Sequence, residues 1–141
     1  CRMPQMKGDA PCIPRRRALL ALATAGFLVY LPPAVGSEQR FPDVVAVKVR
    51  SSGPDVFDFD VTISSPYDTP RRYADGFRVK TLGNQVLGER KLLHDHQDEQ
   101  PFTRDLYSVR IPLAVKRVSV EARDQKHGYG GKVVEVALPG R

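Results

Sequence analysis

The chain has 141 residues, a length typical of a single domain, and a formal net charge of +6. Five of its 22 basic residues but only one of its 16 acidic residues lie in residues 1–36, so residues 37–141 carry a net charge of only +2. This near balance excludes the strongly basic surface of a nucleic-acid-binding protein. Both cysteines, Cys1 and Cys12, also lie in the first segment, which excludes disulfides, thiol chemistry and cysteine metal sites from residues 37–141.

Residues 1–36 have the order of segments that is typical of a secretory signal peptide. Three arginines at residues 15–17 precede an apolar run over residues 18–31, and small residues follow at 34–36. The run is too short to span a membrane comfortably, and no cysteine follows it, so we expect cleavage near Gly36–Ser37 and no stable membrane anchor. The arginines and the two leucines after them also resemble a twin-arginine export signal, which leaves two export routes open.

From Phe41 onward, apolar and polar residues alternate with a period of two, which is typical of antiparallel strands with one buried face. Five segments show this alternation clearly, and weaker patterns predict two further strands at residues 86–93 and 103–111. Turn signals rich in Gly and Pro separate the seven predicted strands. No amphipathic helix is predicted after residue 36. The side chains expected to face inward are Val45, Val47, Val49, Phe57, Phe59, Val61, Ile63, Phe77, Val79, Val118, Val120, Ala122, Val134, Val136 and Leu138.

Seven short strands in about 100 residues predict an all-β, two-sheet sandwich over residues 43–139, after a short linker at residues 37–42. The layout resembles the immunoglobulin-like and fibronectin type III superfamily, most closely in the hairpin formed by residues 118–124 and 132–136. It departs from that superfamily in two respects, because there is no Trp near Phe77 and no tyrosine corner at Arg117-Val118.

Two stretches, residues 94–104 and 127–132, also resemble an uncharacterised group of small exported bacterial proteins. That resemblance implies a periplasmic or extracellular location. It implies no activity.

The three histidines of the predicted domain, His94, His96 and His127, form the first candidate site. Successive loops of a seven-strand sandwich alternate between its two ends, so the loops that carry these histidines share one end. If residues 94–96 are extended, His94 and His96 point the same way and His127 closes a site suited to copper or zinc. The alternative is a solvated polar loop. The acidic residues expected to orient the imidazoles or to add a ligand are Asp95, Asp98 and Glu99.

A second candidate site at the same end is a set of tyrosines and arginines. Tyr67, Arg71, Arg72 and Tyr73 lie in the loop before the third strand, and Tyr129 lies in a predicted glycine-rich hairpin tip at residues 128–131. Tyrosine and arginine are the residue types that anchor interfaces, so these residues predict a binding surface. The alternative is a proline-stiffened loop with solvated arginines, and a Tyr129 that packs on its own loop.

Catalytic signatures are missing from residues 37–141, which contain no Gly-x-Ser-x-Gly motif, no phosphate loop and no marked pair of carboxylates. We therefore expect a non-catalytic, exported binding or accessory domain that recognises a protein or glycan of the cell envelope. The loops expected to do so are residues 67–75, 94–100 and 126–132. The alternative function is a periplasmic copper- or zinc-binding protein.

Overall fold

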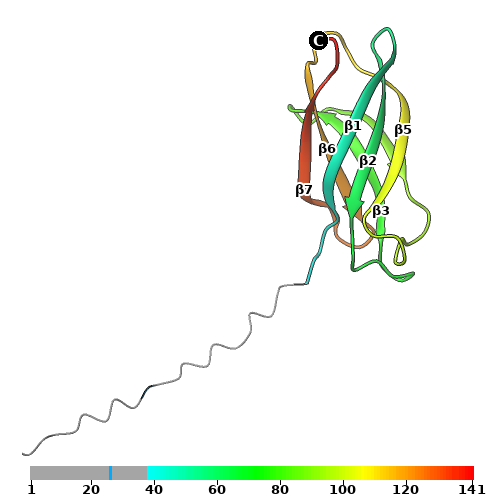
Figure 1. Ribbon diagram of the computed structural model, residues 1–141, viewed down its shortest axis with the longest axis vertical. Helices are drawn as coiled ribbons and strands as arrows, with labels where there is room; N and C mark the ends of the chain where they lie inside the picture. Colours follow the sequence, from blue (N-terminus) through cyan, green and yellow to red (C-terminus); the bar gives the residue numbers. More distant parts are fainter. Residues whose placement is uncertain (1–25, 27–37) are drawn as a thin grey trace, which may run out of the picture. The chain divides into compact units, whose positions relative to one another are not determined.

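The computed structural model describes residue 26 and residues 38–141 of the chain (Figure 1). Apart from residue 26, the predicted signal peptide and its cleavage site lie outside the described residues. Within the described ranges, no helix is long and apolar enough to cross a membrane.

The prediction of an all-β sandwich is confirmed. The seven strands are β1 (Asp43–Gly53), β2 (Val56–Ser64), β3 (Ala74–Thr81), β4 (Val86–Lys91), β5 (Phe102–Arg110), β6 (Arg117–Asp124) and β7 (Gly128–Ala137). They form a three-stranded sheet in the order β1-β2-β5 and a four-stranded sheet in the order β4-β3-β6-β7, and all neighbouring strands are antiparallel (Figure 1). The described residues thus form two layers with one core between them.

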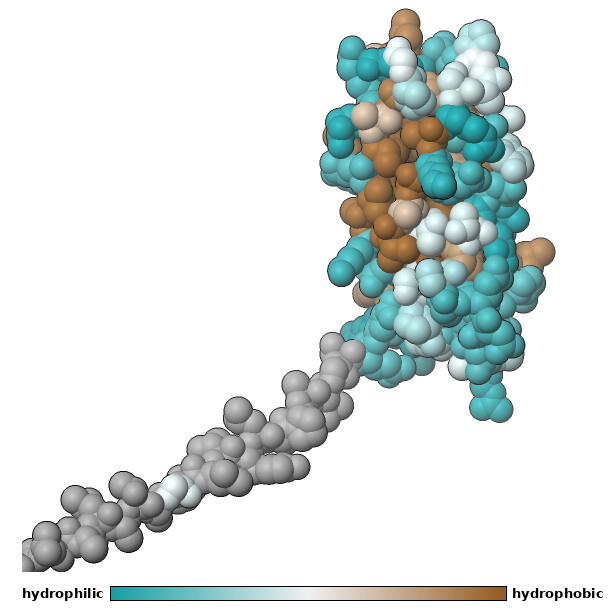
Figure 2. All heavy atoms as spheres, in the orientation of Figure 1, coloured by the Kyte–Doolittle hydropathy of each residue, from teal (hydrophilic) through white to brown (hydrophobic). Residues whose placement is uncertain are grey.

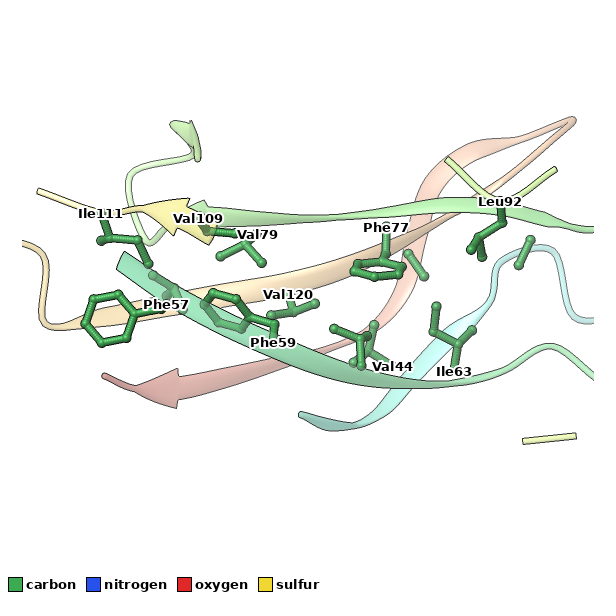
Figure 3. Packing of buried hydrophobic residues seen from close by; sticks show 14 of the residues in the cluster. Val44, Phe57, Phe59, Ile63, Phe77, Val79, Leu92, Val109, Ile111 and Val120 are labelled. Atoms are coloured by element: carbon green, nitrogen blue, oxygen red, sulfur yellow. The ribbon is translucent and has the colours of Figure 1, made fainter. Parts of the chain in front are cut away.

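The core consists of inward-facing residues of both sheets, and the alternation predicts their faces correctly in β2, β3, β6 and β7. Phe59 and Val61 of β2 are fully buried, and Figure 3 shows Phe59 facing Val120 of β6 across the gap between the sheets. Most of the stability of such a sandwich comes from this buried apolar area, at about 25 cal/mol per Å².

Strand β1 differs from the prediction at its start. Val44 is 2% exposed, whereas Val45, which was expected to face inward, is 50% exposed. A β-bulge between Val44 and Ala46 reverses the alternation at this point. Val47 and Val49 are half-buried as they approach β7, and an apolar band is visible on this side of the domain in Figure 2.

The turn between β6 and β7 lies earlier in the chain than the glycines suggest. The predicted glycine-rich tip, residues 128–131, belongs to β7, and the turn itself is residues 125–127. Gly128 ends the turn with a φ of 84°, a conformation that glycine adopts without steric cost. Tyr129 therefore lies in a strand, opposite Arg123 of β6.

The segment before β1, predicted as a linker, is held against the sandwich. Gln39 donates a hydrogen bond to the Ser64 carbonyl at 3.2 Å. The Phe41 ring lies so close to Gly130 that a Cβ there would come within 2.5 Å of it. Because of these contacts, the start of β1 has a fixed position beside the β6–β7 turn.

Candidate functional site

Three loops meet at one end of the sandwich, as the alternation of loops predicts: β2–β3 (residues 65–73), β4–β5 (residues 92–101) and the β6–β7 turn. The His96 amide donates to Asp68 Oδ2 at 3.0 Å, which joins the first two loops. The Gln125 amide donates to the Tyr73 carbonyl at 2.9 Å, which joins the first and the third. The candidate residues therefore lie at the end of the fold that the order of strands predicts.

Asp124, the last residue of β6, is the centre of a buried polar network at this end. Its side chain is fully buried and accepts hydrogen bonds from Arg72 Nε at 3.1 Å and from the amides of Lys126 and His127 at 2.9 and 2.8 Å. Burial acts to raise the pKa of Asp124, but the neighbouring Tyr67 hydroxyl, the two amides and Arg72 outweigh it and lower that pKa. Asp124 is therefore a structural anion that fixes the turn.

Arg72 and Tyr67, two residues of the predicted binding surface, are of intermediate exposure and belong to this network. The Arg72 guanidinium also donates to the carbonyls of Gln39 and Arg40, at 3.0 and 2.7 Å, and lies 4.1 Å from the centroid of the Tyr67 ring. The Tyr67 hydroxyl is buried. Burial, followed by the proximity of Asp124, raises the pKa of Tyr67. Arg71, by contrast, is exposed.

Asp68 is a second structural anion at this end. Its side chain is fully buried; Oδ1 accepts the Ala74 amide and Oδ2 the His96 amide, each at 3.0 Å. Neither Asp68 nor Asp124 stood out in the sequence, because an aspartate beside a turn is an ordinary turn residue. The only signal was their position, Asp68 in the Ser65-Pro-Tyr-Asp turn and Asp124 at a strand end.

The three histidines are not assembled into one site. His94 is exposed and its ring centroid lies 4.9 Å from that of His96. His96 is buried and stacks on Phe102 at 3.9 Å. His127 is exposed and packs edge-on against Phe41 at 6.2 Å. Among residue 26 and residues 38–141, no group of three or more His, Cys, Asp or Glu residues is placed to hold a metal ion.

The failure of the three-histidine hypothesis has a local cause. The hypothesis required an extended segment at residues 94–96, but β4 ends at Lys91 and the chain then turns, so that His96 points into the protein and His94 points out. Of the acidic residues expected beside the histidines, Asp95 Oδ2 accepts the Gln97 amide at 3.3 Å. Glu99 pairs with Arg104 at 2.9 Å, and Asp98 is exposed.

We expect the buried imidazole of His96 to make stability depend on pH. Burial is the largest cause of its lowered pKa, the positive charges of Arg104 and His94 add to it, and Asp68 and Glu99 oppose it. Because the folded-state pKa is below the unfolded value of 6.5, the unfolded chain binds the proton more readily. The free energy of unfolding should therefore fall as the pH drops below that value, until the folded-state pKa is reached.

Urea denaturation of the wild type and of His96→Gln at a series of pH values measures this effect. The variant should lose the part of the pH dependence that lies just below neutrality. His127→Gln, an exposed histidine in another loop, serves as the control and should keep it. Equal pH profiles for the wild type and His96→Gln would contradict the assignment.

A groove of about 460 Å³ lies on the outer side of the four-stranded sheet, next to the loop end. Its volume falls in the range of about 300–1,000 Å³ that is usual for small-molecule sites. Strand β4 contributes residues 89–91 to the lining. The other lining residues are Tyr73, Asp75, Gly76, Leu92, Leu93, Arg123 and Tyr129. Two of the tyrosines that the sequence singled out, Tyr73 and Tyr129, thus line one groove.

The polar side chains of the groove are fixed in pairs. Arg123 forms an ion pair with Asp75 Oδ2, while Asp75 Oδ1 is buried and has no hydrogen-bond donor within residues 38–141. Arg90 pairs with the carboxylate of Asp105. Because each of these arginines is paired with a carboxylate, the groove offers hydrogen-bond donors and acceptors but carries little net charge.

The aromatic side chains of the groove are also fixed. The Arg78 guanidinium lies 3.7 Å from the centroid of the Tyr129 ring, and the Tyr73 hydroxyl lies 3.5 Å from the Leu93 carbonyl. Burial raises the pKa of Tyr129, so its hydroxyl stays protonated at neutral pH. Gly76 gives the β3–β4 pair its close approach, because a Cβ there would lie 2.7 Å from the Arg90 carbonyl oxygen.

Comparisons with known proteins place the chain near one relative. No family model and no solved structure matches it. Over 97 residues, or 69% of the chain, it is 39% identical to a protein of Halomicrobium mukohataei that carries the name "Putative lipoprotein". The match covers 47% of that protein, so the chain spans about half the length of this relative.

Proposed function

We propose that the chain is an exported, non-catalytic binding domain that takes its ligand in the groove beside Tyr73 and Tyr129. The observation that carries this proposal is the groove itself, which brings together side chains from several strands and two loops. Two tyrosines, an exposed leucine and fixed ion pairs supply the combination of apolar contact and oriented polar groups that ligand sites require. The sandwich acts as the rigid support.

Export is supported by the signal-like order of residues 1–36 and by the name of the relative, a putative lipoprotein. Both point to the cell envelope. They differ on the anchor, because the leader predicts release of the domain whereas a lipoprotein stays attached to a membrane. Mass spectrometry of the protein from the cell envelope, which shows whether it carries a lipid, separates the two alternatives.

We further propose that the sandwich is of the fibronectin type III-like kind. The resemblance to that superfamily implies that the first, second and fifth strands form one sheet. The division into sheets β1-β2-β5 and β4-β3-β6-β7 agrees with this expectation. This classification concerns the fold alone, since such sandwiches support many unrelated functions.

A fragment screen followed by amide chemical shifts tests the proposed function, because it requires no assumption about the identity of the ligand. We expect fragments to shift amides around Gly76, Lys91 and Arg123 more often than any other cluster. Leu93→Ser, at a residue 82% exposed on the groove, should weaken the best fragment by about tenfold, the equivalent of about 1.4 kcal/mol. The matched control Leu113→Ser, at a residue 72% exposed outside this groove, should leave its affinity unchanged.

Two results would contradict the proposed function. If fragments cluster elsewhere, or if the two leucine variants weaken binding equally, the groove is not the ligand site.

A further inference from the structure

The chemistry of the groove indicates the class of its ligand, and we infer that it is a neutral oligosaccharide. This inference rests on the proposed function, because it assumes that the groove is the binding site. It is drawn from three properties of the lining: its charge balance, the pairing of its donors with acceptors, and its aromatic rings.

Charge balance argues against a strongly charged ligand. Arg123 is neutralised by Asp75 and Arg90 by Asp105, which leaves Lys91 and Glu89 as neighbours of opposite sign on the same strand. A phosphate, a uronic acid or an acidic peptide gains little from such a site, because the attraction of each cation is already offset by a carboxylate. A ligand without net charge loses nothing there.

The fixed pair of Arg123 and Asp75 suits hydroxyl groups. A sugar hydroxyl is both a donor and an acceptor, so neighbouring hydroxyls can accept from a guanidinium and donate to a carboxylate at the same time. The buried Asp75 Oδ1 has no hydrogen-bond donor among the described residues. Because the ion pair already holds both side chains, little conformational entropy is lost on binding.

The two tyrosines suit the apolar face of a sugar ring. The C–H groups on one side of a pyranose ring are weakly positive and pack on the negative face of an aromatic ring. The Arg78 guanidinium packs on the Tyr129 ring, so this ring is positioned before a ligand arrives, and Tyr73 lines the same groove. The lining combines these rings with charged side chains, a mixture that suits the polar and apolar faces of a sugar.

The test is a titration of the ¹⁵N-labelled full chain with three kinds of probe, followed by amide chemical shifts. The probes are neutral trisaccharides (maltotriose, mannotriose and chitotriose), the anionic trigalacturonate, and a pool of uncharged hexapeptides. We expect at least one neutral trisaccharide to shift groove amides saturably. Tyr129→Ala and Arg123→Gln should each weaken it about tenfold or more. Tyr107→Ala, which removes a tyrosine 55% exposed outside the groove, should not.

The outcomes separate this inference from the function on which it rests. Saturable shifts of groove amides by trigalacturonate or the hexapeptides alone would overturn the neutral-glycan assignment and leave the binding function intact. If fragments cluster in the groove but no trisaccharide binds there, the neutral-glycan assignment is likewise overturned and the binding function remains. Failure of both fragments and trisaccharides at the groove would overturn both proposals. A trisaccharide that is unaffected by Tyr129→Ala and Arg123→Gln would also overturn the inference.

Discussion

Replacing Asp124 by alanine should lower the free energy of unfolding by about 3–5 kcal/mol, the usual cost of removing one partner of a buried ion pair. The change leaves the largely buried Arg72 guanidinium without its buried carboxylate, with only the exposed Glu38 as an anionic partner, and two turn amides without an acceptor. Because the pKa of Asp124 is lowered in the folded state, its stabilisation is present at neutral pH. It is lost as the pH falls through the folded-state pKa.

Chemical denaturation of Asp124→Ala and Asp124→Asn measures this effect. Asparagine keeps an acceptor for the amides of Lys126 and His127, so its loss should be smaller. Asp98→Ala, at an exposed aspartate of the same end, is the control and should change stability by no more than about 0.5 kcal/mol. Trypsin should also cleave after Arg40 faster in Asp124→Ala, because Arg72 holds the Gln39 and Arg40 carbonyls. Equal stabilities of Asp124→Ala and Asp98→Ala would refute the structural role.

A second large effect is expected at Arg141, at the other end of the sandwich. Its side chain is only 6% exposed and donates to the carbonyls of Ile111 and Val115 and to Asp55, each at 2.8 Å. The guanidinium also lies 4.9 Å from the centroid of the Phe57 ring. Arg141→Ala should cost about 2–4 kcal/mol, since hydrogen bonds from a charged donor are each worth about 1.5–3 kcal/mol and are not additive.

Arg141→Lys separates charge from shape in the same denaturation experiment. Lysine keeps the charge but lacks the planar fork that reaches several acceptors at once, so it should recover less than half of the loss. Arg110→Ala, an exposed arginine at the end of β5, is the matched control. If Arg141→Ala is no less stable than Arg110→Ala, the contacts of Arg141 contribute nothing measurable.

The fold was predictable because its signal is local. Phe57, Phe59, Val61 and Ile63 alternate with polar residues over a whole strand, and any antiparallel sheet with one buried face must bury that set. Val45 was assigned to the wrong face for the opposite reason. A bulge adds one residue to a strand and reverses the alternation, and nothing in the local pattern marks its position.

The candidate site was predictable only as far as topology reaches. The order of strands brings Tyr73 and Tyr129 to one end, and the structure places both in the groove. Whether a side chain points inward, however, depends on the path of its loop. His96 turns into the protein beside Phe102, and Arg72 turns toward Asp124, and neither direction follows from the local sequence pattern. Arg123 and Asp75 were missed because their pairing joins two different strands.

In the proposed function, the groove binds the ligand and the network around Asp124 only supports the fold. The most direct measurement is a titration of the best groove-binding fragment into Leu93→Ser and Arg72→Met, with the stability of both variants measured in parallel. We predict that Leu93→Ser keeps its stability and loses affinity about tenfold, whereas folded Arg72→Met keeps its affinity and loses stability. The reverse pattern, with affinity lost in Arg72→Met and kept in Leu93→Ser, would contradict the account.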